Sequence, residues 1–150
     1  PPARGQMTTI YREQSHSLVA VEPVLPEHTR RYGMISGQSV GQRLRRLDGI
    51  VEKPAPEAAP SNLGVAGRYI LTPRIFDFLE RGQKGAGGEI QLTDAIAELL
   101  KVEPVFAYEF TGRRYDCGSK LGYLEATVEF ALTHPELKDD FRRYLRDLKP

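Results

Sequence analysis

The chain has 150 residues, of which 21 are Lys or Arg and 20 are Asp or Glu, so its formal net charge at pH 7 is +1. This balance argues against bulk electrostatic attraction to nucleic acid or to anionic membranes. No apolar run approaches the length of about 18 residues that a membrane-spanning helix needs. A single cysteine is too few for an internal disulfide or a structural zinc site. We therefore expect one soluble, cytoplasmic α/β domain that spans residues 1–150.

The first half of the chain predicts one short helix followed by extended segments. Residues 7–14 are helix-like, and residues 18–21 (LVAV) form an unbroken β-rich apolar run, which is typical of a buried strand. Residues 32–35 and 43–51 predict two antiparallel strands, with a flexible glycine-containing tip at residues 37–41. A further strand is expected at residues 63–71.

The second half predicts mainly helices. Thr72-Pro73 combines a hydroxyl cap with proline, which favours a helix start, and Gly82 is expected to end that helix. Three more helices are indicated by apolar positions within residues 92–100, 121–132 and 137–148, and an alternating strand lies at 105–111. The helices gather toward the C-terminus and predict a mixed sheet that they cover on one side.

The strongest local candidate for a binding site is Val51-Glu52-Lys53-Pro54, at the expected end of a strand. A carboxylate beside an ammonium group places a hydrogen-bond acceptor and a cation on opposite sides of the chain. A sugar phosphate needs both groups, because the carboxylate can hold hydroxyls and Lys can meet the phosphate as a point charge. The same pattern also fits a solvated strand end that binds nothing.

Asp116, in Tyr115-Asp116-Cys117-Gly118, is the second candidate. It lies between a predicted strand and a predicted helix, where carboxylates often bind Mg²⁺ together with phosphate and water. A helix-capping or turn residue is the alternative interpretation. Cys117 is expected to be a small buried apolar residue. The glycine-rich residues 82–88 lack the spacing of a phosphate-binding loop and predict a flexible connection.

Six segments, taken in order, resemble one family. They are VEPV (21–24), YGMI (32–35), GIVEKP (49–54), APSNLGVAGRYIL (59–71), GAGGEIQLTDAI (85–96) and YDCGSKLGYLEATVEF (115–130). Together they resemble the C-terminal half of the bacterial UTP–glucose-1-phosphate uridylyltransferases, also called UDP-glucose pyrophosphorylases. The likeness extends over nearly the whole chain from Met7 onward.

The resemblance implies a fold, a reaction and partners. The fold is the C-terminal part of a nucleotidyltransferase α/β sandwich around a mixed sheet. The family joins UTP and α-D-glucose 1-phosphate into UDP-glucose, releases pyrophosphate and requires Mg²⁺. Its members are homo-oligomers. Their catalysis rests on positioning and on neutralising phosphate charge, because the sugar phosphate is already an anionic nucleophile at neutral pH.

The resemblance also implies binding roles for five residues and assigns none of them as a catalytic residue. Gly33 offers its backbone N–H to a glucose hydroxyl at a position where a side chain would take the place of the sugar. Glu52 accepts hydrogen bonds from sugar hydroxyls, and Lys53 pairs with the phosphate. Val65 lines the sugar through its main chain. Asp116 matches an acidic position near the phosphates and the metal.

One departure from the family limits this interpretation. The family's N-terminal half carries a glycine-rich G-x-G-T-R loop for the nucleotide, a catalytic Lys and another Asp for Mg²⁺, and this sequence holds no such loop. We therefore expect a truncated chain that has no turnover by itself and leaves apolar sheet edges exposed. Two alternatives stay open: a sister sugar-1-phosphate nucleotidyltransferase that uses another base, and a non-catalytic binding or assembly module.

Overall fold

The structure, a computed structural model, describes residues 2–82 and 91–148. The chain divides into two compact units, Pro1–Gly112 and Arg113–Pro150, and each is described by itself. That residues 1–150 act as one sugar-phosphate-binding domain stays a prediction. Most of the glycine-rich segment 82–88 lies outside the described residues.

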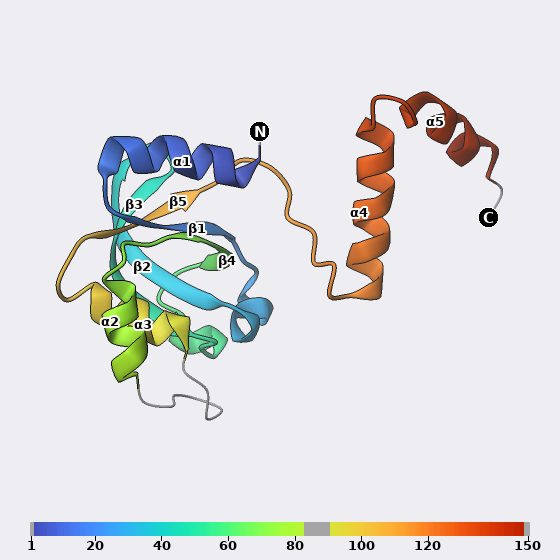
Figure 1. Cartoon of the computed structure of the whole chain (residues 1–150). Coiled ribbons are helices and arrows are strands. Elements are labelled where there is room, and N and C mark those ends of the chain that lie inside the picture. The colour runs from blue at the N-terminus through green and yellow to red at the C-terminus, as the bar shows by residue number, and fades with distance from the viewer. Residues whose placement is uncertain (1, 83–90, 149–150) are drawn as a thin grey trace. The chain divides into compact units, whose positions relative to one another are not determined.

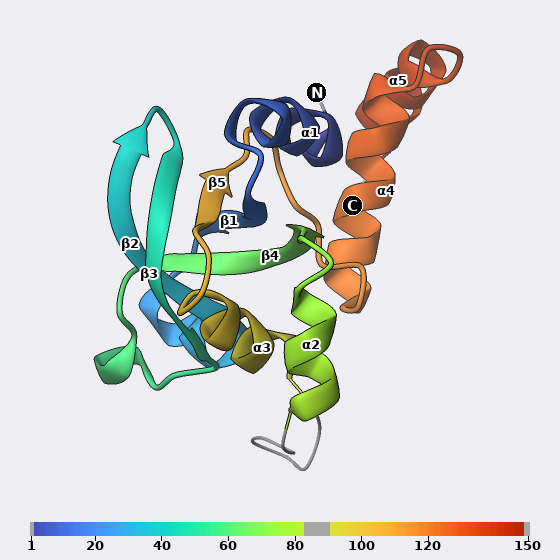
Figure 2. The ribbon, with the colours of Figure 1, turned by 60° about the vertical axis from the view of Figure 1, so that its left-hand side comes forward.

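Unit 1 is built on five strands that form a closed ring (Figures 1 and 2). In chain order they are β1 (Ser17–Pro23), β2 (Gly33–Gly41), β3 (Leu44–Glu52), β4 (Leu63–Ile70) and β5 (Val105–Glu109). The order around the ring is β1-β4-β2-β3-β5. Only the β1–β5 pair is parallel among these strands, so the predicted mixed α/β architecture is confirmed. Each strand has two neighbours, so the expectation of exposed sheet edges is wrong for these five strands.

Strand β1 is buried on both faces, as its unbroken apolar run predicts. Val19 and Val21 lie in a core that includes residues of α2 (Ile75–Arg81) and α3 (Leu92–Leu99). Leu18 and Ala20 lie in a second core with Met7 of α1 (Ala3–Gln14). Helices therefore pack against both faces of β1, and this explains why no polar residue alternates in the run.

The β2–β3 hairpin confirms the predicted antiparallel pair, but its tip is shorter than expected. Strand β2 continues through residues 37–41, which we expected to be flexible, and a tight turn at Gln42-Arg43 follows, with φ of 60° at Arg43. A Cβ at Gly37 would overlap the carbonyl oxygen of Arg46 on the facing strand. The glycine at position 37 therefore allows the two strands to approach closely, and it does not make the segment flexible.

The predicted start of α2, with Thr72 as the cap and Pro73 as the first helical residue, is wrong by two residues. The helix begins at Ile75 and has no side-chain cap, and Thr72 instead donates its hydroxyl to Oε1 of Glu103 at 2.6 Å. The backbone N–H of Thr72 donates to Oγ of Ser17 at 3.0 Å. A more distant partner thus uses the hydroxyl that the sequence assigned to the helix cap. The helix ends at Arg81 and Gly82 follows, as expected.

Two short 3-10 helices, η1 (Pro26–Arg31) and η2 (Pro56–Ala58), flank the site described below. The hydroxyl of buried Thr29 in η1 donates to the carbonyl oxygen of Pro54 at 3.0 Å. This bond fastens η1 to the chain just after β3, so the segment that follows Glu52 is held at a defined place.

Unit 2 consists of a connecting segment followed by α4 (Lys120–Thr133) and α5 (Lys138–Asp147). The two helices are separated at His134-Pro135, as predicted. Arg113 forms ion pairs with Glu125 at 3.2 Å and Glu129 at 3.0 Å, which ties the connecting segment to one side of α4. Cys117 is exposed, so the expectation that it is buried is wrong.

No helix within the described parts of the chain, residues 2–82 and 91–148, has the length and apolar character needed to cross a membrane.

Candidate functional site

The site is built around Glu52, the last residue of β3. In the β2–β3 ladder Glu52 lies opposite Gly33, the first residue of β2. The side chain of Glu52 is only 18% exposed. Oε2 of Glu52 accepts a hydrogen bond from the hydroxyl of Thr93, at the start of α3, with 2.5 Å between the oxygens. Two strand ends and a helix start therefore meet at one carboxylate.

Gly33 lies close to this carboxylate and to Thr93. A Cβ at Gly33 would lie 3.2 Å from Oε2 of Glu52 and 3.4 Å from Oγ1 of Thr93, a distance that forces one of them to move. A side chain at Gly33 would therefore crowd Glu52 and Thr93, and the expectation that it would take the place of the sugar stays a prediction. A hydrogen bond from its N–H to a sugar hydroxyl stays a prediction.

Lys53 does not project opposite Glu52, as simple strand alternation predicts. Its backbone φ is 47°, an uncommon value for a residue with a Cβ, and its N–H donates to the carbonyl oxygen of Tyr32 at 2.9 Å. This turn breaks the alternation, and Nζ of Lys53 lies 3.6 Å from Oε1 of Glu52. The side chain of Lys53 is 57% exposed, so the ammonium group borders the carboxylate and remains open to a ligand.

Val65 lies in β4, on the other side of β2. The preceding residue, Gly64, pairs with Met34 of β2, so the main chain of Val65 runs close to the start of β2. The Val65 side chain is buried in the core with Ile35. Any contact with a ligand must therefore come from its main chain, which is the role that the resemblance implied and that remains untested.

Two further residues near Glu52 were missed by the sequence analysis. Burial raises the pKa of Tyr69, in β4, and the negative charge of Glu52 raises that pKa further. Thr93 donates to Glu52 directly. Both residues lie within segments that carry the family resemblance, residues 59–71 and 85–96. The sequence itself did not indicate that Thr93 bonds to Glu52 or that Tyr69 is close enough to be affected by its charge.

The raised pKa of Tyr69 gives a testable pH dependence. The folded chain holds the Tyr69 proton more tightly than the unfolded chain, in which tyrosine titrates near pH 10. The resulting stabilisation is full below about pH 10 and is lost as pH rises through the folded pKa. We expect Glu52→Gln to lower the pKa of Tyr69, measured by tyrosinate absorbance. Tyr69→Phe identifies its signal among the seven tyrosines. An unchanged titration in Glu52→Gln would contradict the coupling.

Asp116 lies in unit 2, whereas the other four predicted residues lie in unit 1. Its Oδ1 accepts from the N–H of Gly118 at 3.1 Å, and its carbonyl oxygen accepts from the N–H and the hydroxyl of Ser119, each at 3.1 Å. These hydrogen bonds form the turn that leads into α4. The alternative interpretation of Asp116 as a turn residue therefore describes what the structure shows. Within the described residues, no group of three or more His, Cys, Asp or Glu could hold a metal ion.

A divalent metal would therefore find one hard oxygen donor at Asp116. Mg²⁺ keeps several waters in proteins and is commonly bound through one or two carboxylates together with substrate phosphates. Asp116 fits such a metal as one of several ligands, with the others supplied by phosphate oxygens, water or residues elsewhere. Its role as a ligand remains a proposal.

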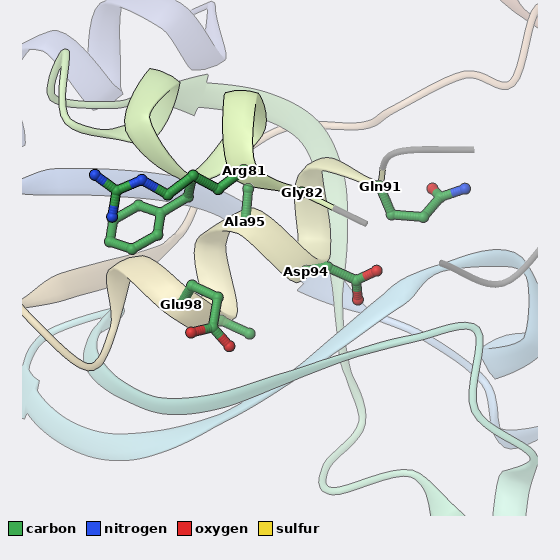
Figure 3. A pocket seen from close by; sticks show the side chains of 8 residues that line it. Arg81, Gly82, Gln91, Asp94, Ala95 and Glu98 are labelled. Atoms are coloured by element: carbon green, nitrogen blue, oxygen red, sulfur yellow. The ribbon is translucent and has the colours of Figure 1, made fainter. Parts of the chain in front are cut away.

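A hollow of about 500 Å³ lies between α2 and α3 (Figure 3). Arg81, Asp94 and Glu98 border it, but Figure 3 shows their charged groups pointing in different directions. A ligand site needs a few polar groups that converge. Around Glu52 such groups converge, and in this hollow the described ones do not, so Glu52 marks the better candidate.

Comparison with known proteins identifies the family to which the chain is similar. The model of the nucleotidyl transferase family matches residues 5–132. A UTP–glucose-1-phosphate uridylyltransferase of Staphylococcus haemolyticus is 46% identical over 147 residues, which are 98% of this chain and 51% of that protein. The enzyme of that name from Streptococcus pneumoniae is 47% identical over 148 residues, 98% of this chain and 50% of that protein. The chain thus spans about half the length of these curated relatives.

Solved structures indicate a similarity to the same enzymes. A UDP-glucose pyrophosphorylase in complex with UDP-glucose superimposes with a TM-score of 0.81 at 44% identity, covering 86% of this chain and 49% of that one. A UTP-bound enzyme of this kind from Acinetobacter baumannii gives a TM-score of 0.82 at 40% identity, covering 96% and 50%. The resemblance inferred from the six segments is confirmed, and the chain belongs to the nucleotidyl transferase family.

Proposed function

We propose that this chain is the sugar-phosphate-binding half of an enzyme that joins UTP and α-D-glucose 1-phosphate into UDP-glucose and pyrophosphate. The observation that carries the proposal is the 46% identity, over 98% of the chain, to a relative named for this activity. The convergence of Glu52, Lys53 and Thr93 beside Gly33 supports it, because a hydrogen-bond acceptor and a cation lie together there.

In the proposed mechanism these residues position the sugar phosphate. Glu52 accepts from sugar hydroxyls, Lys53 neutralises part of the phosphate charge, and Gly33 leaves room for the ring. A phosphate oxygen of glucose 1-phosphate then attacks the α-phosphorus of UTP in line. The new P–O bond forms as the bond to the β-phosphate bridging oxygen breaks, and pyrophosphate leaves. Holding the nucleophile at this angle is the main contribution of the chain.

Nucleotidyl transferases generally use a divalent metal. We propose Mg²⁺ for this enzyme, with Asp116 as one ligand. The bound ion would supply neutralisation of phosphate charge. The turn that leads into α4 holds the Asp116 backbone in place through Ser119.

We also propose a cytoplasmic homo-oligomer. The location is consistent with the nucleoside triphosphate that the reaction needs. The oligomer is supported by large apolar side chains on α4 and α5 that their own unit leaves uncovered, among them Leu124, Phe130 and Tyr144. Sedimentation of the purified chain at several concentrations would show whether copies associate.

The proposed function is tested by titrating the chain with glucose 1-phosphate in a calorimeter. Saturable binding, tighter than that of glucose or inorganic phosphate alone, is expected because the site has groups for both parts of the ligand. Circular dichroism on the same samples verifies that the chain is folded. A folded chain that binds glucose 1-phosphate no better than inorganic phosphate would contradict the proposed sugar site.

A further inference from the structure

The start of α3 contributes a polar group to the site through Thr93. The side chain of Glu52 and the hydroxyl of Thr93 are 41 residues apart in sequence and 2.5 Å apart in space. Thr93 is buried, with only 8% of its surface exposed. A hydrogen bond between a hydroxyl and an ionised carboxylate is among the stronger ones in proteins.

The two oxygens of the Glu52 carboxylate have different partners. Oε2 accepts from Thr93, and Oε1 faces the ammonium group of Lys53 at 3.6 Å. Lys53 is long, flexible and more than half exposed, so it fixes the carboxylate plane poorly. The Thr93 hydroxyl is short and is held by the backbone of a helix. Its hydroxyl is therefore better placed than Lys53 to fix the orientation of this carboxylate.

We propose that Thr93 is a positioning residue, which holds the Glu52 carboxylate in the orientation that accepts hydrogen bonds from hydroxyls of the sugar phosphate. A carboxylate has about four lone-pair directions, so one bond to Thr93 leaves acceptor capacity for a ligand. The inference rests on the proposed function, because it concerns the sugar that this site is proposed to bind.

A purely structural role for Thr93 is the competing explanation. The methyl group of Thr93 also packs near Gly33, where a Cβ would lie 3.5 Å from it. Substitutions can separate the two roles. Thr93→Val keeps the branched shape and removes the hydroxyl, whereas Thr93→Ser keeps the hydroxyl and removes the methyl.

The experiment is calorimetric titration of the variants with glucose 1-phosphate and, separately, with inorganic phosphate. Thr93→Val is expected to weaken binding of glucose 1-phosphate by about tenfold, the effect of losing one hydrogen bond to a charged group. Thr93→Ser should restore binding to within about twofold. Affinity for inorganic phosphate should not change, because the phosphate is met by Lys53. Thr8→Val, on α1, is the matched control.

A reciprocal test uses Glu52→Ala. In that background, removal of the Thr93 hydroxyl should have no further effect on glucose 1-phosphate binding, since Thr93 acts through the carboxylate. If Thr93→Val fails to fold by circular dichroism, Thr93→Ala is measured in its place.

The outcomes separate the two proposals. A folded wild-type chain that does not bind glucose 1-phosphate defeats the proposed function and the positioning role with it. Wild-type binding that Thr93→Val leaves undiminished, or a loss that Thr93→Ser does not restore, defeats the positioning role alone. A similar loss of affinity for inorganic phosphate would indicate a general disturbance of the site and would also overturn the positioning role.

Discussion

Replacing Lys53 by alanine is expected to weaken binding of glucose 1-phosphate by roughly tenfold or more, as the loss of one charge-assisted contact worth about 1.5–3 kcal/mol predicts. The ammonium group stands 3.6 Å from Glu52 and is open to a ligand phosphate. Its loss removes the cation that offsets the charge of that carboxylate, so an incoming phosphate would meet uncompensated negative charge. Calorimetric titration of the chain measures the change.

The matched control for this substitution is Lys101→Ala. Lys101 is also exposed and also pairs with a carboxylate, Oε1 of Glu98 at 2.5 Å, but it does not border the proposed site. Its replacement should leave glucose 1-phosphate binding unchanged. Equal affinity of wild type and Lys53→Ala at low ionic strength, where charge contacts are strongest, would remove Lys53 from the phosphate site.

Gly122→Ala is expected to destabilise unit 2 by about 1–2 kcal/mol. A Cβ at Gly122 would overlap the carbonyl oxygen of Asp116 and lie 2.9 Å from both its carbonyl carbon and the Ser119 hydroxyl. That carbonyl cannot move freely, because Ser119 donates to it twice. Overpacking against a fixed backbone typically costs about 1–3 kcal/mol, which outweighs the gain of about 1 kcal/mol or less in helix propensity. Amide hydrogen exchange in α4 reports the loss.

Gly5→Ala in α1 is the control, because the chemical change is the same and the surroundings differ. A Cβ at Gly5 would meet nothing within 4 Å, so only the helix-propensity gain remains and α1 should become more stable. Asp116→Asn removes the negative charge of Asp116 but keeps the turn, since the amide oxygen of Asn can still accept a hydrogen bond from the N–H of Gly118. Faster exchange in Gly5→Ala, or unchanged protection of α4 in Gly122→Ala, would show that the packing argument fails.

Local sequence patterns predicted the elements whose partners are near in sequence. The run 18–21 was correctly predicted as a buried strand, and the β2–β3 hairpin was predicted because its strands are adjacent. The start of α2 was predicted less accurately. The predicted cap at Thr72 fails because Glu103, 31 residues away, takes the hydroxyl. A hydrogen-bond partner that is so distant in sequence cannot be predicted from the local sequence pattern.

The candidate site was predicted only in part, for the same reason. The pattern and the resemblance indicated Glu52 and Lys53, but strand alternation placed the two charges on opposite sides. The positive φ of Lys53 brings them together, and no local rule predicts that value for lysine. Thr93 and Tyr69 were missed because their relation to Glu52 depends on how the ring of strands closes and on where α3 packs against it.

The way the ring closes has a consequence for the residues around Glu52. Strands β2 and β4 share a single residue pair, Met34 with Gly64, whereas the β2–β3 and β1–β4 ladders extend over several pairs. The seam between β2 and β4 is therefore the least hydrogen-bonded join in unit 1, and it lies beside Gly33 and Val65. Small separations there would change the spacing between Gly33 and Val65 while the longer ladders stayed intact. The same join that completes the barrel would then set the distance between two of the residues proposed to contact the sugar phosphate.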